Sequence, residues 1–143
     1  MLPTIPLGPH RVSRLIIGGN PFSGFSHQSP EMDRLFMDYY TVANIKAALF
    51  ECERQGLNAM QLRADRHITR MIREYRAEGG RLQWIAQTAS EIGDQEAHIR
   101  QIAPEAIAIY HHGTLTDACW REGRMGQVCD RLKVMRDCGV VVG

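Results

Sequence analysis

Two adjacent histidines, His111 and His112, are the residues of this chain best suited to chemistry. They directly follow the uncharged apolar run 106–110, and a glycine and two threonines lie just beyond them. An apolar run of this length predicts a buried strand, so the histidines are expected where that strand ends. Imidazole titrates near neutral pH and can act as a general acid or general base. We therefore predict acid/base catalysis at His111 or His112. The alternative is that neither is catalytic, and that one is a hydrogen-bonded histidine at the end of the strand while the other is a surface residue.

A second polar group follows the apolar run 57–62. Arg63, Asp65 and His67 occur within five residues of one another at the end of that predicted strand. Asp65 is suited to be a catalytic carboxylate, and Arg63 to clamp a substrate anion. His67 adds a candidate metal ligand. The alternative is that Asp65 caps the helix that follows, with solvated charges around it.

Three further residues are predicted to bind substrate together with Arg63. Gln87 and Thr88 follow the apolar run 82–86, and we expect them to hydrogen-bond a polar substrate. As nucleophiles they would need an adjacent base. Asn20 follows a glycine pair and precedes Pro21, so its amide either orients a ligand or completes the turn.

No metal site or cofactor is predicted. One of the two histidines, Asp65 and His27 would make a ligand set suited to zinc or manganese. However, no motif with metal-ligand spacing supports that set. The glycine fingerprints of dinucleotide-binding and phosphate-binding loops are also missing, so the cofactor stays unknown.

Strand and helix patterns alternate along the chain. This alternation predicts βαβ units and a parallel sheet, in an α/β fold. A doubly wound open sheet and a partial (β/α)8 barrel both fit the length. Strands are expected at 14–17, 57–62, 82–86, 106–110 and 140–143, and helices at 42–54 behind Thr41 as N-cap, 67–77, 94–102 and 127–137, with one turn at 116–120. Residues 1–13 are expected to form an extended lead-in, and 22–40 a long loop or lid with a short helix over 31–39.

Four short motifs carry a family resemblance. They are Leu15-Ile16-Ile17-Gly18-Gly19-Asn20-Pro21-Phe22, Gln61-Leu62-Arg63, Gln87-Thr88 and Tyr110-His111-His112. With them the chain resembles the N-terminal half of an aldolase-type TIM barrel, nearest to the aldo/keto reductase-like barrels and uncharacterised bacterial relatives. The resemblance implies a half-barrel of about four to five β/α units, with the carboxyl ends of the strands on one active face.

The resemblance also implies roles for individual residues. His111 or His112 matches the family's histidine at the end of the fourth strand, and Asp65 loosely matches its aspartate after the second. Gln87 stands where the family has a lysine. The function implied is acid/base chemistry on a small polar carbonyl or sugar-like metabolite. The alternative is a catalytically silent half-barrel, a self-associating structural or ligand-binding remnant.

Self-association is expected because an incomplete barrel leaves strand edges unpaired and an apolar interior open to water. Two copies could close such a gap, so we predict a homodimer or higher oligomer. The alternative is that the chain is a truncated product of a longer protein.

Length and charge set the remaining limits. At 143 residues the chain is long enough for one domain, predicted over 1–143. With 17 basic and 16 acidic residues it has no charge pattern for binding nucleic acid. No apolar run approaches the ~20 residues of a membrane span, so no membrane partner is expected. Four cysteines without a CxxC pair, and a first segment unlike a signal peptide, predict a cytoplasmic protein.

Overall fold

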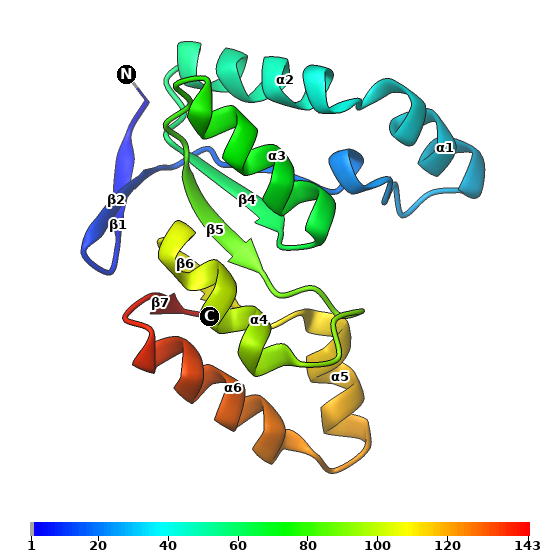
Figure 1. Ribbon diagram of the computed structural model, residues 1–143, viewed down its shortest axis with the longest axis vertical. Coiled ribbons are helices and arrows are strands. Elements are labelled where there is room, and N and C mark those ends of the chain that lie inside the picture. Colours follow the sequence, from blue (N-terminus) through cyan, green and yellow to red (C-terminus); the bar gives the residue numbers. More distant parts are fainter. Residues whose placement is uncertain (1) are drawn as a thin grey trace. The chain divides into compact units, whose positions relative to one another are not determined.

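The computed structural model describes residues 2–143, and the chain divides between Gln83 and Trp84 into two compact units (Figure 1). Helices and parallel strand pairs occur in both units, which confirms the predicted α/β class. The half-barrel, and its extent as one domain, stay predictions. No helix within the described residues has both the length and the apolar character that crossing a membrane requires.

The first unit begins with a hairpin. Strands β1 (Thr4–Leu7) and β2 (His10–Ser13) pair antiparallel within the segment predicted as an extended lead-in. Asn58 fixes the hairpin to the residues just before β4. Its Oδ1 accepts a hydrogen bond from the Ser13 backbone at 2.6 Å, and its Nδ2 donates to the Arg11 carbonyl at 3.1 Å.

A short parallel pair follows. Strand β3 (Ile17–Gly18) pairs with β4 (Ala59–Arg63), with Ile17 opposite Met60. The first residue predicted for the strand over 14–17 was therefore wrong, because β3 starts at Ile17. The strand predicted over 57–62 is confirmed, with its two ends at Ala59 and Arg63. The backbone before β3 is held in another way, since the Ser13 hydroxyl donates to the Leu15 carbonyl at 2.7 Å.

The segment predicted as a long loop or lid, 22–40, is mostly helical. It contains most of the 3₁₀ helix η1 (Pro21–Ser23) and the helix α1 (Pro30–Tyr39), so the short helix expected there is confirmed. Ser29 starts α1, because its Oγ accepts from the Met32 backbone at 3.2 Å. This use of serine as an N-cap satisfies one of the free N–H groups of the first turn.

The two long helices of this unit are α2 (Val42–Arg54) and α3 (Arg66–Ala77), and both were predicted. Thr41 caps α2 as expected: its Oγ1 accepts from the Asn44 backbone at 3.3 Å. Each helix buries one apolar stripe at three-to-four spacing, the pattern of a surface helix on a core. The buried residues are Ile45 and Leu49 of α2, and Ile68, Met71, Ile72 and Tyr75 of α3.

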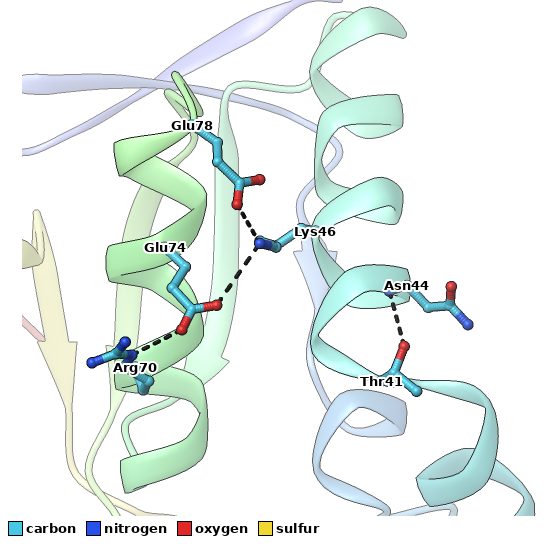
Figure 2. A network of polar contacts seen from close by, with 6 residues as sticks. All are labelled: Thr41, Asn44, Lys46, Arg70, Glu74 and Glu78. Carbon is cyan, nitrogen blue, oxygen red and sulfur yellow. Dashed lines mark hydrogen bonds and ion pairs between the residues drawn. The ribbon is translucent and has the colours of Figure 1, made fainter.

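A charged network joins α2 to α3 (Figure 2). Lys46 of α2 forms ion pairs with Glu78 and, at 3.8 Å, with Glu74, which also accepts from Arg70 Nε at 2.8 Å. The hydrogen bond to Glu78 raises the pKa of Lys46, so the ammonium stays charged. Ion pairs near the surface contribute little, so apolar packing is the main force between these helices.

The second unit contains three parallel strands. Strand β6 (Ala108–Tyr110) lies between β7 (Val141–Val142) and β5 (Gln83–Gln87), whose first residue is the last of the first unit. The strands predicted at 82–86, 106–110 and 140–143 are thus confirmed with shifted ends. Because β5 and β6 run parallel, their carboxyl ends lie at the same edge.

Three α-helices complete this unit. They are α4 (Gln95–Ile102), which continues into the 3₁₀ helix η2 (Ala103–Glu105), α5 (Gly113–Arg121) and α6 (Met125–Asp137). The predictions for α4 and α6 are confirmed, whereas the single turn predicted at 116–120 was wrong because α5 is a full helix. Helix α6 packs against both α4 and α5. Its buried residues are Val128, Val134 and Met135, while Leu132 is half-buried.

We expect Gly80→Ala to destabilise the chain. A Cβ at Gly80 would lie 2.3 Å from the ring of Tyr75, which is fully buried. Overpacking of this kind costs about 1–3 kcal/mol, measured as the free energy of unfolding in urea. Gly18→Ala is the control, since a Cβ there meets nothing within 4 Å. Equal stability of the two variants would contradict the prediction.

Candidate functional site

The structure places the predicted site residues in two groups, one in each unit. In each group the residues lie at the carboxyl ends of two strands, as the sequence predicted: β3 and β4 in the first unit, β5 and β6 in the second. The first unit holds Asn20, Arg63 and Asp65; the second holds Gln87, Thr88, His111 and His112. The single shared active face stays a prediction.

Asp65 is the N-cap of α3. Its Oδ1 accepts from the Ile68 backbone at 2.8 Å, so the capping alternative is confirmed. Its Oδ2 accepts from Ser23 Oγ at 3.2 Å and lies 3.9 Å from Arg63 Nε. Both carboxylate oxygens therefore have partners within the unit, and a role as catalytic carboxylate would compete with them.

Arg63 packs against an aromatic ring, whereas Asn20 is exposed. The Arg63 guanidinium lies over the ring of Phe25, 5.5 Å from its centroid, an arrangement that cation–π attraction favours. Asn20 is exposed, and its carbonyl rather than its amide serves the turn, accepting from the Phe25 backbone at 2.9 Å. The Asn20 side chain is therefore available to a ligand.

Thr88 joins two strand exits in the second unit. It is fully buried, its backbone N–H donates to the Tyr110 carbonyl at 3.1 Å, and its Oγ1 accepts from the His112 backbone at 3.0 Å. Gln87, the last residue of β5, is half-buried beside it. Thr88 thus orients the start of the loop after β6, and a direct contact with substrate is not open to its buried hydroxyl.

His112 begins helix α5. Its Nδ1 accepts from the Thr114 backbone at 3.1 Å, as the N-cap side chain. A ring nitrogen that accepts a hydrogen bond carries no proton, so the cap requires neutral imidazole. The lone pair that a general base would use is engaged in the cap.

His111 is buried, with 7% of its surface exposed, and both its ring nitrogens are bonded. Arg131 Nη1 lies 3.1 Å from Nε2, and Thr116 Oγ1 lies 2.7 Å from Nδ1. Because a guanidinium only donates, Nε2 must accept, and Nδ1 carries the proton and donates to Thr116. Thr116 Oγ1 in turn donates to the His112 carbonyl at 3.2 Å. These bonds form one directed chain from α6 through His111 to the start of α5.

Burial lowers the pKa of His111, and electrostatic interactions with the Arg131 guanidinium and with the His112 ring lower it further. Desolvation disfavours the charged imidazolium, and a neighbouring cation does the same. The imidazole is therefore held neutral, in the form that can accept from Arg131. It could act as a base only after Arg131 had moved away from Nε2.

A surface pocket of about 650 Å³ lies between the start of α4 and the first half of α6. Its lining is largely polar and carries charges of both signs. Arg131 belongs both to this lining and to the bond with His111, so it connects the pocket to the strand exit of β6. The lining consists of Gly93, Asp94, Gln95, Glu96, Ala97, Arg100, Gln127, Asp130 and Arg131.

None of the residues that line the pocket was predicted from the sequence as a site residue. Gln127, Asp130 and Arg131 have the i, i+3, i+4 spacing of one helix face, which could have been read as a polar stripe on α6. Nothing in the sequence links that stripe to His111, since twenty residues separate Arg131 from it.

No group of three or more histidine, cysteine, aspartate or glutamate side chains among residues 2–143 is arranged to hold a metal ion.

No protein-family model, curated protein or solved structure matches this chain. The resemblance to aldo/keto reductase-like barrels therefore stays a prediction.

We expect Asp65→Ala to lower the free energy of unfolding by about 0.5–2 kcal/mol, because the first turn of α3 loses its cap. Asp65→Ser is the matched control, since serine also caps helices and should retain most of the stability. Urea denaturation measures both variants. If Asp65→Ala were as stable as the parent, the cap would contribute nothing and a functional role would gain weight.

We expect the stability contributed by neutral His111 to be lost in acid. Its native-state pKa is lowered from 6.5, so this contribution is complete above that pH and disappears as the pH falls through the lower native value. The free energy of unfolding in urea is measured for both proteins at about pH 7.5 and at about pH 5. It should fall more between these two pH values for the parent than for His111→Gln. The same loss in both proteins would show that His111 does not titrate in this way.

Proposed function

We propose that this chain is an α/β protein that binds a small polar metabolite in the pocket between α4 and α6. The observation that carries the proposal is Arg131, which lines the pocket while His111 holds its guanidinium at Nη1. A pocket of about 650 Å³ is of the size that small metabolites occupy.

Arginine chemistry indicates one end of the ligand. A guanidinium has five N–H donors, and the bond to His111 uses only one nitrogen of Arg131. The remaining donors suit a carboxylate or phosphate group, which guanidinium binds in a bidentate manner. Arg100 on the same pocket lining adds a second guanidinium.

Binding without catalysis is favoured by the state of the two histidines. Nε2 of His111 and Nδ1 of His112 each accept a hydrogen bond from the protein, so neither lone pair is open to a substrate proton. This supports the ligand-binding alternative that the sequence left open. The half-barrel architecture and a homodimer or higher oligomer remain parts of the proposal.

Acid/base catalysis at His111 is the second candidate, and one observation favours it. Arg131 contacts both His111 and the pocket, so a ligand carboxylate that attracted Arg131 would release Nε2 as a base. The substrate would then be a small polar carbonyl or sugar-like metabolite.

We expect a sugar phosphate or a small carboxylate to raise the melting temperature of the parent, because a ligand that binds only the native state stabilises it. Thermal shift measurements with sugar phosphates, small carboxylic acids, NADP and divalent metal ions test this. Arg131→Gln should abolish the shift, whereas Arg136→Gln, a change of the same charge on α6 outside the pocket lining, should retain it.

No shift with any of these compounds would refute an anion-binding pocket, and an equal shift in both variants would place binding elsewhere. Following the same mixtures for product formation separates the two candidates. Turnover that is lost in His111→Gln would favour catalysis over binding alone.

A further inference from the structure

We propose that the ligand of the pocket between α4 and α6 is a small zwitterion, with an anionic group and an ammonium group in one molecule. This inference rests on the proposed binding function and specifies the chemical class of its ligand. It is drawn from the charges of both signs that line the pocket.

Charges of both signs line the pocket without neutralising one another. Arg100 and Arg131 supply guanidinium groups, and Glu96 and Asp130 supply carboxylates. Within the part of the chain that the structure describes, neither guanidinium forms an ion pair with either carboxylate. The fifth charged residue of the lining, Asp94, is already engaged, since its Oδ1 caps α4 by accepting from the Ala97 backbone at 3.0 Å.

This arrangement discriminates between ligand classes. A simple anion that bound the two guanidiniums would be repelled by Glu96 and Asp130, and a simple cation would be repelled by Arg100 and Arg131. A zwitterion can place its carboxylate against the guanidiniums and its ammonium against the carboxylates. Opposed charges in one pocket therefore favour the ligand that carries both signs.

The test compares matched probes by isothermal titration calorimetry on the parent chain. The zwitterions are glycine, β-alanine, γ-aminobutyrate and ε-aminocaproate, which span a series of separations between the two charges. Each is compared with the carboxylate and the amine of the same chain length. At least one zwitterion should bind about tenfold more tightly than both of its single-charge analogues, the effect of one additional charge-assisted bond.

Single-charge variants locate the two ends of the ligand. Arg100→Gln should weaken zwitterion binding at the carboxylate end, and Asp130→Asn should weaken it at the ammonium end. Both side chains are exposed, so the fold should be retained. Lys133→Gln and Asp137→Asn make the same charge changes on α6 outside the pocket lining, and they should leave binding unchanged.

The outcomes separate this inference from the function on which it rests. If carboxylates bind as tightly as every zwitterion, the zwitterion is refuted and an anion-binding pocket stands. If the zwitterions bind equally well to Arg100→Gln, Asp130→Asn and the controls, their site lies elsewhere. If neither these probes nor the sugar phosphates bind, both proposals fail.

Discussion

The hydrogen bond from Arg131 to His111 connects three parts of the second unit. It joins α6 to the exit of β6, and through Thr116 it continues to the start of α5. The direction of these hydrogen bonds is fixed, because a guanidinium cannot accept a hydrogen bond. The His111 imidazole must therefore be neutral in order to accept from Arg131. Burial enforces the same protonation state. The position of the Arg131 guanidinium in the pocket thus depends on His111, which is itself buried.

The residues at the strand exits show how capping and chemistry compete for the same side chains. Asp65 and His112 both accept from the backbone of a first helical turn. In a βα unit a helix starts just beyond a strand, and its free N–H groups require polar partners. A carboxylate or histidine at such a position is therefore suited either to cap the helix or to take part in chemistry. In this protein the structure shows the capping hydrogen bond.

Helices were predicted better than strands, and the reasons are local. The apolar stripe of α3 repeats at helical spacing, and the four residues that the helix buries all lie on that stripe. Helix α5 was mistaken for one turn because its first turn depends on His112, a residue that seldom signals an N-cap. The strand predicted over 14–17 starts later because Ser13 and Asn58 hold the preceding backbone in contacts between distant residues.

By itself the sequence determined the alternation of strands and helices, the faces that the helices bury, and the polar residues that follow each strand. These features depend on residue type and spacing within one element, so they can be read locally. Only the tertiary structure decided that Arg131 reaches His111, that Thr88 is buried against the His112 backbone, and that charges of both signs line one pocket. Such contacts join elements far apart in the chain, and packing rather than local pattern brings them together.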